Sequence, residues 1–274
     1  MVYILLPVHN RREVTRRFVA CLKDQTYRHY RLLLIDDGST DGTAGMVRNE
    51  LEEVTVITGS GDWWWAGSLQ QGYEWLRRQS VADNDLVLIA NDDTEFAPDF
   101  LARAVALMRG RGGLLLASSF SRSNGRLVSG GVKIDWRRLK FASTQNPDEI
   151  DCLPTRGLFM QVADFLGLGG FYPRLLPHYL SDYEFTLRAR RRGMRLWVND
   201  GLKVLVDETT TGFREFEGEN INVFLRRYFA KNSDANPFYW SAFLLLACPW
   251  PWILLSLMRV WYGTAVKVVR SIFP

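Results

Sequence analysis

The sequence has 274 residues, of which 47% are hydrophobic and 23% charged, so it can build a sizeable core and is not a wholly disordered chain. Its net charge of +4 is too mild to indicate nucleic acid as a partner, and it fits contact with phosphates or anionic lipid. Three widely spaced cysteines, without a CxxC pair or metal-ligand spacing, predict a reduced, cytoplasmic chain. The opening residues MVYILLPVHNRR lack a basic segment and a cleavage site, so we expect a first strand there rather than a signal peptide.

The first hundred residues alternate short apolar runs with amphipathic segments. Four runs bounded by turns predict strands, at Val2–Leu6, Arg31–Ile35, Val54–Thr58 and Leu86–Ala90. Helical spacing of apolar residues predicts helices at Glu13–Lys23, Ser68–Arg78 and Ala97–Met108, the last with a proline in its first turn. This alternation predicts an α/β fold with a mostly parallel sheet, in which ligands bind beyond the carboxyl ends of the strands.

The rest of the chain is less uniform. The middle, Leu114–Phe171, is interrupted by glycine and proline and is expected to be irregular. An arginine-rich helix is predicted at Ser181–Arg192, followed by edge strands at Met194–Val198 and Lys203–Val206. The composition changes after residue 236, since Pro237–Pro274 contains basic residues but no acidic ones.

Two of the predicted strands end in paired carboxylates. The segment LLIDDGSTDGT delivers Asp36 and Asp37 into a turn, where they either accept hydrogen bonds from a base and a ribose or form an ordinary acidic turn. The segment LVLIANDDTE ends in Asn91, Asp92 and Asp93. Adjacent carboxylates repel unless a cation or hydrogen bonds offset their charge, and oxygen ligands suit Mg²⁺ or Mn²⁺. The alternative is a solvated acidic loop.

A third acidic segment, HYLSDYEFTLRARRR, places Asp182 and Glu184 at the start of a helix. The helix dipole favours carboxylates there, and Asp182 is also a candidate general base for an acceptor hydroxyl. The sequence contains no persuasive Ser–His–Asp arrangement, no Walker loop, no GxGxxG and no zinc motif.

Together these residues resemble the family-2 glycosyltransferases, which have the GT-A fold, over about residues 1–215. The segments PVHNR and IDDGSTDGT are similar to the family's nucleotide-binding start, and ANDDTEF resembles its DxD motif. The resemblance implies that Asp93 binds Mg²⁺ or Mn²⁺. It also implies a nucleotide site made of Pro7, Val8, Asn10, Arg11, Asp36, Asn91 and Asp92.

Two further segments resemble bacterial rhamnosyltransferase-like enzymes of surface-polysaccharide synthesis. They are GDWWWAGSLQQGY, with a WWxG element, and LPHYLSDYEFTLRARRRG. The likeness implies an inverting transferase that takes a dTDP- or UDP-sugar, with dTDP-rhamnose among the candidates, and uses Asp182 as the catalytic base. It places the donor and acceptor cleft at Trp65, Gly67, Gly157, His178 and Glu184.

The sequence departs from the family pattern in two places. Asn91 replaces the first aspartate of the DxD motif. Asp207 and Glu208 stand where the family often has a histidine after the last strand, which leaves the third metal ligand open. A nucleotidyltransferase is one rival interpretation, although its Gly-rich, Lys-containing opening loop is missing. A non-catalytic or partner-dependent sugar-nucleotide-binding protein is another.

The C-terminal segment, residues 216–274, is expected to be helical and separate from a catalytic domain of residues 1–215. Phe238–Met258 is 21 residues long and uncharged, which is enough to span a bilayer, but prolines interrupt its middle. This pattern favours a surface-lying helical pair that holds the enzyme, through residues 238–274, on the cytoplasmic side of the inner membrane. A homodimer interface ranks second and a single span third. Membrane contact would suit a glycan or lipid-linked glycan acceptor.

Overall fold

The computed structural model describes residues 1–207 and 221–272, so the domain boundary expected at residues 215 and 216 lies outside the described residues. Its centre is one mixed sheet with the strand order β3-β2-β1-β4-β10-β6-β11-β5, and β7 pairs with β6. Its strands are β1 (Val2–Val8), β2 (Tyr30–Asp36), β3 (Val54–Thr58), β4 (Leu86–Ile89), β5 (Thr94–Glu95), β6 (Leu114–Ser121), β7 (Leu127–Ser129), β10 (Leu158–Gln161) and β11 (Leu196–Val206). β8 (Gly131–Asp135) and β9 (Lys140–Thr144) form a separate two-stranded sheet.

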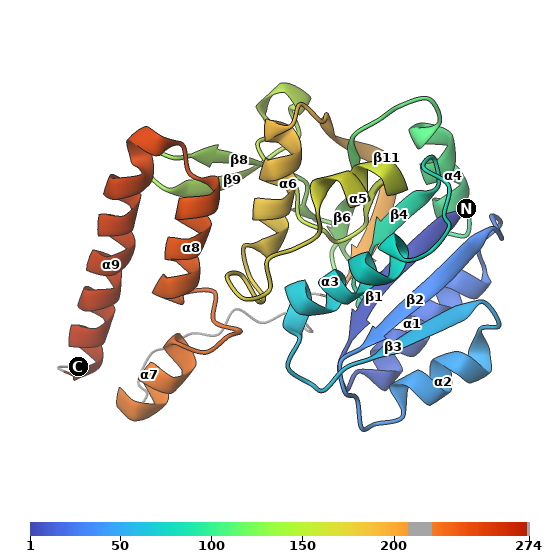
Figure 1. The fold of residues 1–274 in the computed structure, drawn as a ribbon, viewed down its shortest axis with the longest axis horizontal. Coiled ribbons are helices and arrows are strands. Elements are labelled where there is room, and N and C mark those ends of the chain that lie inside the picture. The colour runs from blue at the N-terminus through green and yellow to red at the C-terminus, as the bar shows by residue number, and fades with distance from the viewer. Residues whose placement is uncertain (208–220, 273–274) are drawn as a thin grey trace.

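Helices cover both faces of this sheet (Figure 1). They are α1 (Arg12–Lys23), α2 (Thr43–Glu50), α3 (Trp64–Arg77), α4 (Phe100–Met108), α5 (Val162–Leu168) and α6 (Ser181–Arg191). Three more helices, α7 (Ile221–Tyr228), α8 (Pro237–Ala247) and α9 (Trp250–Ile272), lie beside the sheet, and a short 3₁₀ turn, η1, is at Pro147–Glu149. The fold is therefore mixed α/β with a mostly parallel sheet, as the sequence predicted.

The four predicted N-terminal strands are confirmed and pair in parallel. β3 has the predicted bounds, while β1 and β2 run slightly longer because Pro7 pairs with Ile35 and Val8 with Asp36. β1 is buried at every position, since a parallel strand covered on both faces needs apolar side chains on both sides. The carboxyl ends of β1, β2 and β4 consequently meet at one edge of the sheet.

The second half of the sheet differs from the prediction. β10 lies within the stretch expected to be irregular, and it inserts antiparallel between β4 and β6. The two predicted edge strands are wrong, because they form one strand, β11, with a register shift between Asn199 and Lys203. β11 pairs with β6 along its length and with β5 at its end. A bulge thus joins what the sequence suggested were separate strands.

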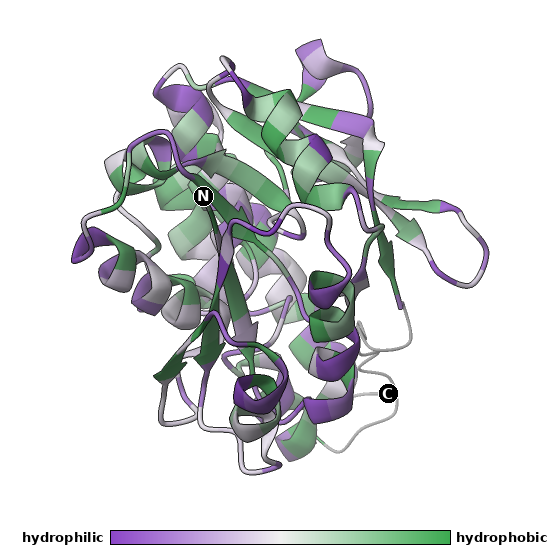
Figure 2. Cartoon of the chain, turned by 90° about the vertical axis from the view of Figure 1, so that its right-hand side faces the viewer, coloured by the Kyte–Doolittle hydropathy of each residue, from purple (hydrophilic) through white to green (hydrophobic). Residues whose placement is uncertain are grey.

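Two apolar layers flank the sheet. One packs α1, α2 and α4 against it, around Phe18, Met46 and Leu101, and the other packs α3, α5 and α6 through Leu69, Phe165 and others. Figure 2 shows hydrophobic strands in the interior and hydrophilic residues mainly on outer helices and loops. This arrangement fixes the helix N-termini that follow the strand ends and hence the place of the site.

Two helices start three or more residues away from the predicted position. α3 begins at Trp64 rather than Ser68, because the backbone N–H groups of Trp63 and Trp64 are held by Asp37. α4 begins at Phe100 rather than Ala97, and the predicted first-turn proline lies before it, where its carbonyl accepts a hydrogen bond from the Thr26 N–H.

A third apolar cluster joins the C-terminal segment to the rest of the fold. Phe243 and Ala247 of α8 pack against the hairpin β8–β9 and against Leu187 of α6. The helix breaks after α8, and Pro251 falls in the first turn of α9, where proline is tolerated. Residues 238–258 therefore form a helix, a turn and part of a second helix, which rules out a single spanning helix over that range.

Candidate active site

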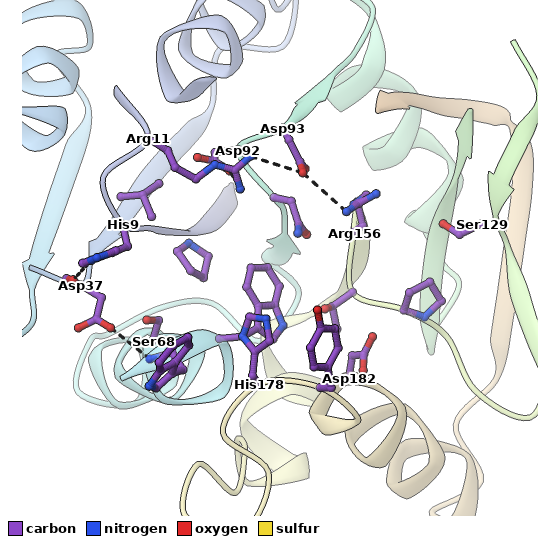
Figure 3. Close-up of a pocket in the computed structure, with 18 of the residues that line it drawn as sticks. His9, Arg11, Asp37, Ser68, Asp92, Asp93, Ser129, Arg156, His178 and Asp182 are labelled. Atoms are coloured by element: carbon purple, nitrogen blue, oxygen red, sulfur yellow. Dashed lines mark hydrogen bonds and ion pairs between the residues drawn. The ribbon is translucent and has the colours of Figure 1, made fainter. Parts of the chain in front are cut away.

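A cavity of about 580 Å³ opens at the carboxyl ends of β1 and β4, between the N-termini of α3 and α6 (Figure 3). Its predicted members are Pro7, Val8, Arg11, Trp65, Asn91, Asp92, Asp93, His178 and Asp182. The structure adds His9, Asp37, Gly61, Trp64, Ser68, Val128, Ser129, Pro154, Thr155, Arg156 and Tyr179. Side chains from distant parts of the sequence thus converge at the edge where ligands bind in open α/β sheets.

One side of the cavity carries two buried carboxylates held by arginines. Arg11 lies 3.0 Å from an oxygen of Asp92 and 3.6 Å from one of Asp93, and Arg156 approaches Asp93 to 3.7 Å. The Thr15 hydroxyl also donates to Asp92, at 3.1 Å. Burial raises the pKa of Asp92 to about 6, against the opposing effect of the Arg11 guanidinium. Positive charge at this spot therefore stabilises the ionised form.

Asp182 lies on the other side of the cavity, at the start of α6 (Figure 3). Its carboxylate accepts a hydrogen bond of 2.9 Å from the Tyr183 N–H. Burial raises its pKa to about 6, and that hydrogen bond and the Arg156 charge oppose the rise only in part. A carboxylate with a pKa near neutrality is well matched to take a proton from a hydroxyl group.

An aromatic wall stands beside Asp182. The ring of His178 packs edge-on against Trp64, with centroids 5.8 Å apart, and against Tyr179, at 4.7 Å. Burial lowers the pKa of His178 to about 4, so its imidazole is neutral at physiological pH. Flat apolar faces next to polar atoms are the surfaces that pack against sugar rings.

Asp37, rather than the predicted Asp36, lines the cavity. Its carboxylate accepts hydrogen bonds from the backbone N–H groups of Gly61, Trp63 and Trp64, at 2.7, 2.8 and 3.1 Å. Asp36 does not line the cavity, and its carboxylate accepts a hydrogen bond of 2.8 Å from the Ser39 N–H. Asp37 therefore stabilises the turn at residues 61–64, which forms one wall of the cavity.

Other residues predicted for the site support it from outside the cavity. Asn10 has a φ of 51° and accepts from the Thr40 N–H at 2.8 Å. Gly67 donates its N–H to the Trp63 carbonyl inside the first turn of α3. Gly157 has a φ of +83°, and an added Cβ would lie 3.2 Å from that of Ala117. None of these three residues lines the cavity.

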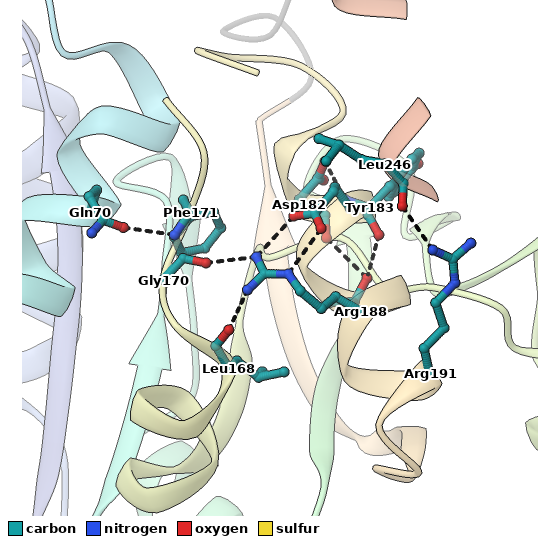
Figure 4. A network of polar contacts seen from close by, with 11 residues as sticks. Gln70, Leu168, Gly170, Phe171, Asp182, Tyr183, Arg188, Arg191 and Leu246 are labelled. Carbon is teal, nitrogen blue, oxygen red and sulfur yellow. Dashed lines mark hydrogen bonds and ion pairs between the residues drawn. The ribbon is translucent and has the colours of Figure 1, made fainter. Parts of the chain in front are cut away.

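Glu184 is buried and paired with Arg188 instead of facing the cavity. The guanidinium donates to the carbonyls of Leu168 and Gly170 (Figure 4). It also lies 2.9 Å from the Glu184 carboxylate and 4.7 Å from the centroid of the Tyr172 ring. Each partner thus offsets the charge of the other. The network ties α6 to the end of α5 and so fixes the helix that presents Asp182.

The opposite side of α6 is held by the C-terminal segment. Arg191 donates to the carbonyl of Leu246, at 2.8 Å, and to that of Ala247, at the last turn of α8 (Figure 4). A cation at a helix C-terminus satisfies carbonyls that have no partner within the helix. Helix α6, which presents Asp182, is therefore anchored on one side by α5 and on the other by α8.

The most consequential residue that sequence reasoning missed is Arg156. Its signal is the short apolar run LFMQV next to it, which forms the antiparallel strand β10 beside β4. A strand at that run places the residues before it at the same edge as Asp92 and Asp93 only if it runs antiparallel to β4, a direction that the run itself does not specify.

The site fits a divalent cation shared with a substrate better than one held by protein alone. In residues 1–207 and 221–272, no group of three or more His, Cys, Asp or Glu side chains is placed to hold a metal. Asp92 and Asp93 nevertheless supply carboxylate oxygens at the cavity, and Mg²⁺ is commonly bound by one or two carboxylates plus substrate phosphates. Of the alternative third ligands, Asp207 does not line the cavity, and Glu208 lies outside the described residues.

The family model for glycosyl transferase family 2 matches residues 3–164, which is more than half of the chain. The protein therefore belongs to that family, and sugar transfer is the general activity that the family and the fold support. No curated protein sequence matches the chain.

Solved structures with the same fold are GT-A glycosyltransferases. One is the mannosyltransferase PcManGT from Pyrobaculum calidifontis in complex with GDP-Man and Mn²⁺, with a TM-score of 0.58, 17% identity, and coverage of 97% of this chain and 75% of that one. Another is S. aureus TarS 1-349 in complex with UDP-GlcNAc, with a TM-score of 0.63, 16% identity, and coverage of 98% and 89%. The match spans only 54% of a longer TarS chain. At these identities the likeness establishes the fold.

Proposed function

We propose that this protein is an inverting glycosyltransferase that moves one sugar from a nucleoside diphosphate to a hydroxyl of a glycan or lipid-linked glycan, in cell-surface polysaccharide synthesis. One observation carries the proposal: Asp182, with its pKa raised to about 6, faces the Asp92–Asp93 pair across a single cavity. A base and a leaving-group site on opposite sides of a bound sugar are what direct displacement with inversion needs.

In this proposal the chain's own groups divide the work. Asp182 takes the proton of the acceptor hydroxyl as its oxygen attacks the anomeric carbon. Asp93, with Asp92 beside it, would hold Mg²⁺ or Mn²⁺, and a cation there would neutralise charge on the departing diphosphate. Trp64, Trp65 and neutral His178 would position the sugar and exclude water.

The donor in this proposal is a dTDP- or UDP-sugar, with dTDP-rhamnose among the candidates. The resemblance of the segment GDWWWAGSLQQGY to rhamnosyltransferase-like enzymes supports this donor class, as does the UDP-GlcNAc bound by TarS. Because PcManGT binds GDP-Man, GDP-sugars must also be included when donors are tested.

A donor panel with dTDP-, UDP- and GDP-sugars, with and without Mg²⁺ or Mn²⁺, tests the activity. We expect one donor to give metal-dependent release of nucleoside diphosphate and, with an acceptor present, a product of inverted anomeric configuration by NMR. Pyrophosphate release from a nucleoside triphosphate and a sugar phosphate would instead identify a nucleotidyltransferase. Binding without turnover, even with acceptor extracts, would favour a non-catalytic role.

We further propose that α9 rests on the cytoplasmic face of the inner membrane as a peripheral anchor. The helix is long and apolar enough to cross a membrane by length and composition, and only 11% of its most apolar window is buried. Exposed apolar residues recur along it every three or four positions, including Trp250, Leu254, Met258 and Tyr262, which gives one apolar stripe. Its charged residues are all basic, namely Arg259, Lys267 and Arg270, which suits anionic headgroups.

Vesicle sedimentation tests the anchor. We expect the protein to bind vesicles with anionic lipid more tightly than neutral ones and to be released by high salt. Leu254→Glu combined with Tyr262→Glu should abolish binding, whereas Leu205→Glu, at an exposed leucine of β11, should not. Resistance to salt and alkaline extraction would indicate a spanning α9, and a stable dimer without vesicle binding would indicate a homodimer interface.

A further inference from the structure

Arg156 is placed at the site by the antiparallel insertion of β10. Leu158 pairs with Ile89 of β4, so the chain just before β10 lies beside the chain just after β4. Gly157 fixes this position from both sides, since its N–H donates to the Ile89 carbonyl and its own carbonyl accepts from the Ala117 N–H, each at 3.0 Å. The side chain of Arg156 therefore projects from rigid backbone, as a preorganised binding group requires.

The guanidinium of Arg156 stands between the two acidic sides of the cavity. Its side chain is only 17% exposed, and one nitrogen lies 3.7 Å from an oxygen of Asp93. Its charge also reaches Asp182, where it lowers the pKa against the effect of burial. A mostly desolvated cation in this position faces the space between the leaving-group side and the base.

The contact with Asp93 leaves the guanidinium able to take a second anion. A separation of 3.7 Å is an ion pair that is longer than a hydrogen bond. Arg11 differs, because it contacts Asp92 at 3.0 Å and its side chain is 32% exposed. The planar fork of arginine matches phosphate oxygens, so Arg156 is the better placed of the two to turn toward a phosphate inside the cavity.

We propose that Arg156 is a diphosphate-binding residue, which leaves Asp93 and binds the phosphate next to the sugar when a nucleoside diphosphate enters the cavity. The guanidinium stays protonated and stabilises negative charge on the leaving diphosphate, and its departure would leave the Asp93 carboxylate available to a divalent cation. This inference rests on the proposed function, because it assumes a nucleoside diphosphate in this cavity.

Calorimetric binding of UDP, dTDP and GDP, and of the matching nucleosides, to the full chain in the presence of EDTA tests this role without turnover. We expect Arg156→Gln to weaken binding of the preferred nucleoside diphosphate about tenfold or more and to leave its nucleoside unchanged. Arg156→Lys should recover only part of the loss, because it restores charge but not the fork. Arg109→Gln, at an exposed arginine following α4, is the matched control and should bind like the wild type.

The outcomes separate the inference from the function on which it rests. Equal binding of the diphosphate by Arg156→Gln and the wild type overturns the role of Arg156 and leaves sugar transfer standing. An equal loss for nucleoside and diphosphate also overturns it, since the effect would then come from a damaged cavity. A wild-type chain that binds no nucleoside diphosphate, with or without metal, contradicts the proposed function itself.

Discussion

Replacing Asp182 by asparagine is expected to lower activity and raise stability, because the same burial that tunes the carboxylate as a base also makes its ionisation costly. The pKa of Asp182 rises from 3.8 to about 6, a change of roughly two units that corresponds to about 3 kcal/mol at about 1.4 kcal/mol per unit. The folded chain holds this proton more tightly than the unfolded chain, so its stability falls as pH rises from about 4 to 6. Asparagine is neutral throughout and avoids that cost.

The free energy of unfolding should therefore converge in wild type and Asp182→Asn only below about pH 4, differ by about 1 kcal/mol at pH 4.5, and differ by up to about 3 kcal/mol above pH 6, in favour of asparagine. Urea unfolding followed by tryptophan fluorescence at pH 4.5 and 7.5 measures this difference. We expect kcat to drop by roughly 10² to 10⁴, while binding of the nucleoside diphosphate changes less than about twofold, since Asp182 would contact the acceptor side.

The pH dependence supplies an independent check. Wild-type kcat should fall below about pH 6 as Asp182 takes up a proton. The pKa of Asp92 is also raised to about 6, so Asp92→Asn is the control that separates the two carboxylates. In that variant kcat should still fall below about pH 6. A variant Asp182→Asn that is less stable than wild type at pH 7.5, or that retains turnover, would refute the reasoning.

Three further substitutions test the framework of the site. Asp93→Asn should remove the Mn²⁺-dependent part of nucleotide stabilisation in thermal shift assays, and an unchanged response to Mn²⁺ would contradict its role as ligand. Asp37→Asn should weaken the hold on the backbone N–H groups of Gly61, Trp63 and Trp64, cost about 1–3 kcal/mol of stability and raise the KM for donor; a change in stability alone would make Asp37 purely structural. Arg188→Met should cost about 3–5 kcal/mol in urea unfolding, since it leaves buried Glu184 without its cation, and a loss below about 1 kcal/mol would show that Glu184 finds another partner.

Local patterns were sufficient for the four parallel strands of the N-terminal half of the fold. The strand at Val54–Thr58 has the predicted bounds, and Asp92, Asp93 and Asp182 all line one cavity as their motifs suggested. These features depend on apolar periodicity, turn residues and the rule that parallel strands bring their carboxyl ends together. Each of these signals is contained in a few neighbouring residues.

Local sequence patterns could not tell which of Asp36 and Asp37 lines the cavity. Adjacent side chains at a strand end point to opposite faces of the sheet. Which of the two aspartates faces the turn at Trp63 and Trp64 depends on the course of the chain from β2 through β3 to that turn. The structure assigns the three backbone N–H groups of that turn to Asp37. A motif that contains both aspartates cannot separate them.

The α/β class, the resemblance to the family and the acidic motifs could all be recognised in the amino-acid sequence, because each is encoded by local spacing and composition. The antiparallel course of β10 beside β4, which brings Arg156 next to Asp93, became visible only in the folded chain. The same holds for the packing of α8 on α6 and for the exposed apolar stripe of α9. Both outcomes depend on pairing and packing between segments far apart in the chain, which a local pattern does not specify.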